Sequence, residues 1–179
     1  MTDPRTVRQA RDEFLEANGF TMEAYDAPIV EIPLGPVTVK LPNTDGRKVL
    51  VRWHDLHHVA TGYGTDAAGE AEIGAWELAS GCTNLASYVY NGMAVLLGLL
   101  VAPVRTFRAF RRARARTLYR IGLGYDEALA LPLVELRERM GLPAFVLDGG
   151  RDLESVTGEA RGLVESASRK RISTAGREG

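Results

Sequence analysis

The spacing of apolar side chains predicts a mainly helical chain with a small antiparallel β-hairpin or sheet near its start. In residues 5–18, Val7, Ala10 and Phe14 recur at helical spacing, and Gly19 stands where a helix is expected to end. Between residues 28 and 52 apolar residues alternate instead, which is typical of strands with one buried face. We expect a small sheet there, with a hairpin loop at 43–46 and a strand at 49–51.

After Trp53 the pattern predicts a succession of helices. Gly62 and Gly64 mark a tight turn, and Thr65 or Asp66 is suited to cap a helix that runs to about residue 80. A further helix is expected over 126–140, within which Pro132 is suited to begin a new one. We therefore expect one helical domain over residues 1–147. Residues 148–179, rich in Gly, Ser, Arg and Glu, are expected to form a weakly ordered helix and tail.

Residues 83–102 are almost wholly apolar, and an arginine-rich segment follows them. The length meets the criterion for a membrane span, but polar residues and glycines within the stretch favour a buried helix or the wall of a tunnel for a prenyl tail. Arginines at 105, 108, 112 and 116 are spaced to form a helical stripe. Such a stripe is equally suited to lipid phosphates and to solvent.

Composition bounds the class of protein without naming a partner. The 179 residues are 45% hydrophobic and 25% charged, with a net charge of −1, which is ordinary for a folded domain and indicates no nucleic-acid partner. Cys82 is the single cysteine and excludes an internal disulfide, and the start of the chain lacks the pattern of a secretory signal. We expect a cytoplasmic protein.

All three histidines lie within five positions, beside an acidic residue. On a helix, His54 and His58 lie about 40° and roughly 6 Å apart on one face, with Asp55 about 60° from His58. Glu70 follows across the glycine turn and completes a set of metal ligands if the two helices form a hairpin, whereas His57 projects elsewhere. Imidazole nitrogens with carboxylate oxygens suit zinc, and also iron, cobalt or manganese. A packed or surface role is the plainer alternative.

Spacing also separates the candidate chemistries. A metalloprotease of the H-E-x-x-H type has a glutamate where this chain has Asp55, which counts against a peptidase. The HD-type phosphohydrolases draw on a distant histidine, and this chain has none outside positions 54–58. The iron site of non-haem oxygenases, with two histidines and a carboxylate, stays open as an alternative.

The segment His54-Asp55-Leu56-His57-His58, followed by eleven residues and Glu70, resembles the hallmark of the Coq-four proteins of coenzyme Q (ubiquinone) biosynthesis. The likeness is specific over about residues 52–77 and weaker through residue 136. It implies a mainly helical fold and a divalent metal held by His54, Asp55, His58 and Glu70. It also implies work on a prenylated aromatic ring, understood in the family as oxidative decarboxylation with hydroxylation at ring carbon C1.

The resemblance also suggests roles for neighbouring residues. Asp55, Tyr63 and Asp66 are candidate catalytic residues, and Thr65 is a candidate for orienting ligands. Capping is an equally good explanation for Thr65 and Asp66, as turn geometry and close helix packing are for Gly62, Gly64 and Gly69. Glu77 shares a helix face with Glu70; it is expected by default to be a solvated surface residue, with support of the metal site as the alternative.

Two further interpretations stay open beside the metal-dependent enzyme. One is a non-catalytic lipid-binding scaffold that organises a ubiquinone biosynthesis complex, and the other is a related metalloenzyme of another aromatic or secondary metabolite. The partners expected from the resemblance are a prenylated aromatic lipid, other quinone biosynthesis proteins and a second copy of the chain in a homodimer. Peripheral contact with the inner face of the cell membrane is also expected.

Overall fold

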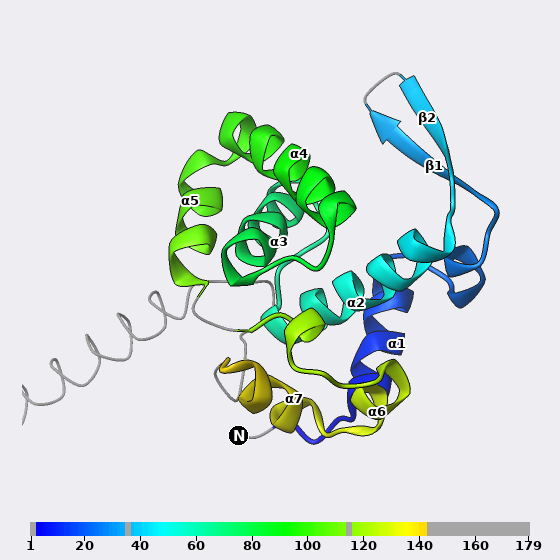
Figure 1. The fold of residues 1–179 in the computed structure, drawn as a ribbon, viewed down its shortest axis with the longest axis vertical. Coiled ribbons are helices and arrows are strands. Elements are labelled where there is room, and N and C mark those ends of the chain that lie inside the picture. Colours follow the sequence, from blue (N-terminus) through cyan, green and yellow to red (C-terminus); the bar gives the residue numbers. More distant parts are fainter. Residues whose placement is uncertain (1–2, 35–36, 114–115, 143–179) are drawn as a thin grey trace, which may run out of the picture.

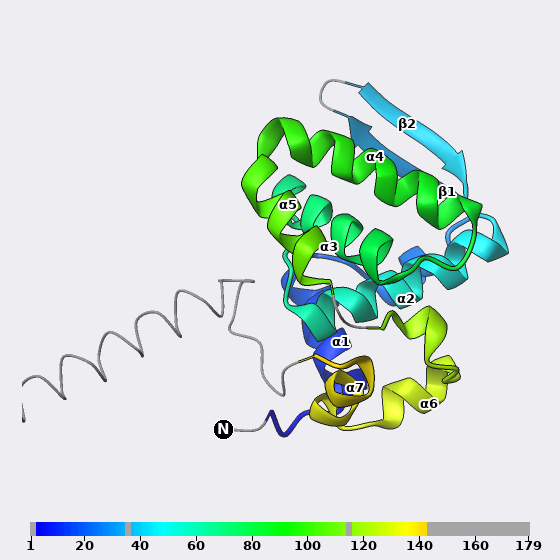
Figure 2. The same cartoon turned by 60° about the vertical axis from the view of Figure 1, so that its left-hand side comes forward.

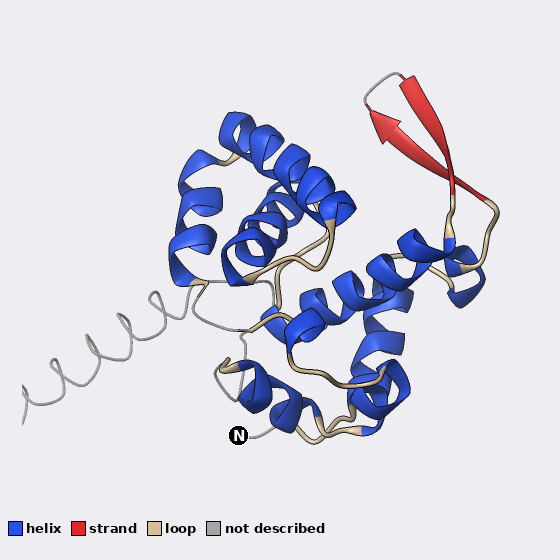
Figure 3. Cartoon of the chain, in the orientation of Figure 1, coloured by secondary structure: helices blue, strands red, loops and turns tan. Residues whose placement is uncertain are grey.

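The computed structural model describes residues 3–34, 37–113 and 116–142, and this part of the chain is mainly helical, as predicted (Figures 1 and 3). It contains seven α-helices, two short 3₁₀ helices and one two-stranded antiparallel sheet. The helix and tail predicted for 148–179 lie outside the described residues.

The first helix, α1 (Val7–Ala17), is held at both ends by local contacts. Thr6 and Gln9 form a capping box at its start, and Gly19 follows its end with the positive φ of 69° that glycine adopts without strain. The 3₁₀ helix η1 (Met22–Tyr25) leads into β1 (Ile29–Leu34) and β2 (Val37–Pro42). The two strands pair antiparallel from Ile29 with Pro42 to Leu34 with Val37, so the predicted hairpin is confirmed.

The loop predicted at 43–46 and the strand predicted at 49–51 are wrong. Helix α2 (Asp45–Thr61) covers both, because Thr44 accepts a hydrogen bond from the Arg47 backbone N–H and begins the helix there. The run Val49 to Val51, which resembles a strand, belongs to a long helix whose next turns carry the histidines.

Three helices form one side of the molecule (Figure 2). Helix α3 (Ala67–Ser80) packs against α4 (Leu85–Val101), and α5 (Pro103–Arg112) returns against both of them. The expectation that 83–102 form a buried helix is wrong, since only Ser87, Asn91 and Gly98 of α4 are buried. Among the helices of the described ranges, none has the length and apolar character needed to cross a membrane.

The arginine stripe is shorter than predicted, because α5 ends at Arg112 and Arg116 lies beyond it. The helix predicted over 126–140 is divided into α6 (Tyr125–Ala130) and α7 (Leu133–Met140), with Pro132 at the break. The 3₁₀ helix η2 (Leu118–Arg120) precedes them. The hydrophobic core joins η2, α6 and α7 to α1, α2 and α3. Its largest fully buried residues are Leu56, Ile73, Leu118, Leu129, Leu133, Leu136 and Met140.

Candidate metal centre

Three of the predicted ligands come together where α2 meets the first turn of α3. The Nε2 atoms of His54 and His58 are 3.1 Å apart. One Glu70 carboxylate oxygen lies 3.4 Å from Nε2 of His54, and the other lies 3.5 Å from Nε2 of His58. The three side chains therefore each offer a ligand atom to one point, as the spacing predicted.

The connection between α2 and α3 brings Glu70 close to the two histidines. Gly62, whose φ is 77°, caps the end of α2, and Asp66 begins α3 by accepting a hydrogen bond of 2.7 Å from the Gly69 backbone N–H. Gly69 lies so close to Gly64 that a Cβ added to it would be 2.1 Å from the Gly64 carbonyl oxygen. Close packing at Gly69 thus places Glu70, the next residue, beside the histidines.

Hydrogen bonds fix which nitrogen of each ligand imidazole carries the hydrogen. Nδ1 of His58 donates to the carbonyl oxygen of Tyr63, 3.0 Å away, and a carbonyl can only accept. Nδ1 of His54 donates to the Glu77 carboxylate, 2.9 Å away. The Nε2 atoms of His54 and His58 are therefore left facing each other with their lone pairs available to a cation.

The electrostatics of the group favour a cation between these nitrogens. Burial alone would lower the pKa of His54, but Glu77 and Glu70 beside it raise that pKa well above 6.5. Burial and the neighbouring His54 lower the pKa of His58 to about 4. Burial opposes ionisation of Glu70, but its hydrogen bond to His54 and the nearby histidines lower its pKa. Without a metal, His54 therefore takes up a proton more readily than His58.

Glu77 is the residue that sequence reasoning misjudged most. The expectation of a solvated surface residue is wrong, since Glu77 is 1% exposed. Its Oε1 accepts hydrogen bonds from Nδ1 of His54 and, at 2.6 Å, from Nδ1 of His57, while Oε2 accepts one of 2.6 Å from Asn91. Burial would raise the pKa of Glu77, but the neighbouring His54 and His57 and their hydrogen bonds lower it below its usual range.

His57 lies outside the group of possible ligands, in agreement with the prediction that it projects elsewhere. It is fully buried, and its Nε2 accepts a hydrogen bond of 2.8 Å from the Leu118 backbone N–H, so its Nδ1 carries the hydrogen given to Glu77. Its ring packs against those of Trp76 and Tyr119. His57 thus joins Glu77 to the core. No sequence pattern pointed to the contact between His57 and Glu77, and the helical spacing of Glu77 from Glu70 pointed only to support of the metal site.

Asp55, the fourth predicted ligand, is not part of the converging group. Its Oδ2 accepts a hydrogen bond of 2.5 Å from the Tyr25 hydroxyl, which belongs to η1. Burial raises the pKa of Asp55 to about 6, although the Tyr25 hydrogen bond and His54 act in the opposite direction. Burial beside Asp55 also raises the pKa of Tyr25.

The other candidate catalytic residues have clear structural roles. Asp66 caps α3, and the Tyr63 side chain packs against the edge of the core while its carbonyl orients His58. The Thr65 hydroxyl donates to the side-chain oxygen of Asn18 at 2.5 Å. For Asp66 the capping alternative is confirmed. A catalytic role for Asp55, Tyr63 or Asp66 stays a prediction.

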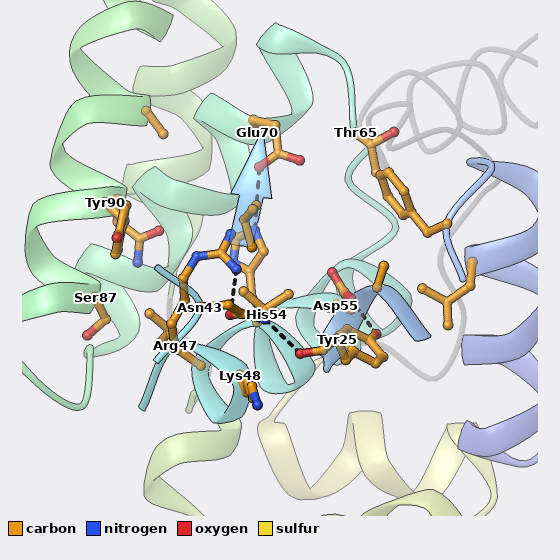
Figure 4. A pocket seen from close by; sticks show the side chains of 18 of the residues that line it. Tyr25, Asn43, Arg47, Lys48, His54, Asp55, Thr65, Glu70, Ser87 and Tyr90 are labelled. Atoms are coloured by element: carbon orange, nitrogen blue, oxygen red, sulfur yellow. Dashed lines mark hydrogen bonds and ion pairs between the residues drawn. The ribbon is translucent and has the colours of Figure 1, made fainter. Parts of the chain in front are cut away.

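A cavity of about 410 Å³ lies beside the centre (Figure 4). Its walls come from α1, η1, β1, α2, α3 and α4, and they include His54, Asp55, Glu70 and Glu77. The rest of the wall is largely apolar, with Leu15, Phe20, Ala24, Val30, Leu50, Val51, Tyr90 and Ala94 among its residues. Two of the three candidate ligands, His54 and Glu70, thus face a space that can hold a small organic molecule, whereas His58 does not line it.

The donor set fits a divalent cation. Two imidazole nitrogens and a carboxylate are the protein ligands of many catalytic zinc sites and of non-haem iron sites, which keep a position open for water or substrate. No family model, curated protein or solved structure matches this chain.

Proposed function

We propose that this protein is a divalent-metal-dependent enzyme whose His54, His58 and Glu70 hold one ion, with zinc as the first candidate and iron, cobalt or manganese as alternatives. The observation that carries the proposal is the pair of Nε2 atoms 3.1 Å apart. Each imidazole is turned so that its lone pair faces the other, and the Glu70 carboxylate lies beside both. Two lone pairs this close repel each other unless a proton or a cation lies between them.

The residues around the centre have separable tasks. Glu77 and the Tyr63 carbonyl orient the two imidazoles, while the apolar wall excludes water and holds a hydrocarbon portion of the substrate. Asp55 lies on the cavity wall with its pKa raised to about 6, which suits it to accept and return a proton near neutral pH. A bound ion would supply Lewis acidity or the activation of oxygen.

The substrate class we propose is a polyprenylated aromatic precursor of coenzyme Q, acted on at ring carbon C1 by oxidative decarboxylation and hydroxylation. What supports it is that three of the four residues in the Coq-four-like motif, His54, His58 and Glu70, converge on one point, and that two of them, His54 and Glu70, also line the cavity. A related metalloenzyme of another aromatic metabolite would use the same residues, and the products formed separate the two.

An exposed apolar face on α4 and α5 favours a peripheral place on a membrane. Leu96, Leu100, Val104 and Phe107 are each more than half exposed, with Leu100 at 83%. Arg108 and Arg111 are exposed on α5, and the Arg111 guanidinium stacks over the Phe107 ring. Apolar side chains flanked by arginines suit the boundary between acyl chains and anionic headgroups. The same face also suits a non-catalytic lipid-binding scaffold, which is the second candidate function.

Replacing a ligand separates an enzyme from a scaffold. In cells that depend on this protein for their quinone, His58→Ala is expected to abolish both metal binding and product, with the carboxylated prenyl precursor accumulating in mass spectra. Glu138→Ala, at an exposed position on α7, is the matched control and is expected to change neither. Full product formation by a stably folded His58→Ala protein that holds no metal would overturn the enzyme and favour the scaffold.

A further inference from the structure

One face of α2 carries two cations into the same cavity that the metal centre borders. Arg47 and Lys48 lie in the first turn of this helix, and both line the cavity together with Leu50 and Val51 of the next turn. His54 follows another turn along (Figure 4). Seven residues at 1.5 Å each place the backbone of Arg47 about 10 Å from that of His54.

The Arg47 guanidinium is held in place without being neutralised. Its Nη1 donates to the side-chain oxygen of Asn43, 3.1 Å away. Asn43 is buried and pinned, because its Nδ2 donates to the carbonyl oxygens of Tyr25 and Ala27 at 2.9 and 2.7 Å. A neutral amide thus orients Arg47, and within the described ranges no carboxylate lies within ion-pair distance of it.

The charge of Lys48, which also lines the cavity, is only weakly paired. Its Nζ is 3.6 Å from Asp45, a fully exposed carboxylate that does not line the cavity, so solvent screens this pair. The acidic residues that do line the cavity are Asp55, Glu70 and Glu77, and each already has a hydrogen-bond or ion-pair partner at the other end. A largely apolar cavity with a fixed cation at one end is matched by a ligand with an acidic group there.

We propose that Arg47 and Lys48 form a subsite for an acidic group, a carboxylate or a phosphate, on an elongated ligand. The apolar body of this ligand lies along Leu50 and Val51, and its other end reaches His54. The inference goes beyond the proposed substrate, since a polyprenylated ring whose only acidic group is the carboxylate at C1 cannot place that carboxylate at this subsite and C1 at the metal centre together. It uses the metal centre only for the ligand's direction. A ligand with only a neutral hydrocarbon tail would leave both cations unmatched.

The test compares three probes with the same chain and different head groups: dodecanoate, dodecyl phosphate and dodecanol. Binding is measured by calorimetry on the full-length protein after chelation, so that no metal can coordinate the probe. The protein is expected to bind at least one acid about tenfold more tightly than dodecanol, because hydrogen bonds to charged groups are stronger than neutral ones. A tighter dodecyl phosphate identifies phosphate as the preferred group, and a tighter dodecanoate identifies a carboxylate.

Three variants assign that preference to the subsite. Arg47→Met and Lys48→Met each reduce the preference for the acid, and the double variant removes it, while dodecanol affinity changes less than twofold. Arg52→Met is the matched control, since Arg52 lies on the same helix and pairs with Asp26 outside the cavity. Equal binding of acid and alcohol by the unaltered protein, or an unchanged preference in a folded double variant, overturns the subsite. Zinc binding, measured separately, is expected to persist in the double variant. A protein that binds no zinc would therefore contradict the proposed metal centre without bearing on the subsite.

Discussion

Nδ1 of His54 lies 2.9 Å from the Glu77 carboxylate, and this hydrogen bond connects the candidate metal centre to the interior of the fold. The same carboxylate oxygen accepts from His57, which in turn accepts from the backbone of Leu118. The orientation of a ligand is therefore set by groups that are themselves buried. A buried carboxylate with all its neighbours donating is costly to remove, because each donor then loses its partner.

Glu77→Ala is expected to lower both stability and metal affinity. The loss leaves donors on His54, His57 and Asn91 without their acceptor, so the free energy of unfolding should fall by about 3 kcal/mol. Zinc affinity should fall by about 10- to 100-fold, since His54 is no longer oriented. Urea unfolding and competition with a chelating dye measure the two effects. Glu77→Gln can still accept a hydrogen bond from His54 and should recover part of the zinc affinity. Equal zinc affinity in Glu77→Ala and the unaltered protein would contradict the role of Glu77 in orienting His54.

Gly69→Ala is expected to damage the metal centre without touching a ligand. The added methyl group would meet the Gly64 carbonyl, which forces α3 to shift and moves Glu70 away from the histidines. Gly92→Ala is the control, because nothing lies near its added Cβ and alanine favours a helix by up to about 1 kcal/mol. Thermal unfolding should show a lower midpoint for Gly69→Ala and no decrease for Gly92→Ala. Normal zinc affinity in Gly69→Ala would show that this contact does not position Glu70.

The sequence was most informative where local chemistry decides the structure. The spacing of His54, His58 and Glu70, together with the Coq-four resemblance, predicted their convergence on the condition that the two helices form a hairpin. Capping at Asp66 was also open to prediction, because the Asp66 side chain needs only the N–H groups of the next turn. The cap depends on the next helical turn, and the convergence depends on two helices that follow each other directly in the sequence.

Sequence reasoning failed where distant segments decide the environment of a residue. Glu77 of α3 has hydrogen-bond partners in its buried position, because His57 from α2 and Asn91 from α4 both donate to its carboxylate. No pattern within α3 reveals these partners. Asp55 was predicted to be a ligand from its angle on α2, yet Tyr25, thirty residues earlier, supplies its hydrogen bond. The apolar character of α4 indicated burial, but an apolar helix at the surface has the same composition.

Asp55→Asn is expected to stabilise the metal-free protein at neutral pH. Folding raises the pKa of Asp55 from 3.8 to about 6, so the folded state binds this proton more tightly and the ionised carboxylate costs stability as the pH rises through that range. An asparagine can still accept from Tyr25. The gain in free energy of unfolding should reach up to about 3 kcal/mol at pH 7.5 and vanish near pH 3.5.

Unfolding in urea at the two pH values measures this difference, and zinc titration of the same variant tests the role of Asp55. We expect Asp55→Asn to keep one zinc per chain, since its carboxylate lies outside the converging group. A large loss of zinc affinity would instead restore Asp55 as a ligand. No gain in stability at pH 7.5 would contradict the raised pKa.

Charges placed on the exposed face of α4 are expected to weaken binding to lipid vesicles. Leu96→Glu with Leu100→Glu should lower the partition into vesicles containing anionic lipid at least about tenfold, because two apolar contacts are lost and like charges are brought together. Sedimentation with vesicles measures the partition. Val49→Glu, at an exposed apolar position on α2, is the control. Equal sedimentation of all three proteins would contradict membrane docking by α4.

The X-ray absorption spectrum of the protein loaded with one equivalent of zinc tests the metal centre most directly. The account predicts tight uptake of one ion per chain and a first shell that contains two imidazole nitrogens at about 2.0 to 2.1 Å and carboxylate or water oxygens at about 2.0 to 2.2 Å. His58→Ala should lose one imidazole from this shell. A folded protein that takes up no divalent ion, or one whose spectrum is unchanged by His58→Ala, would contradict the account.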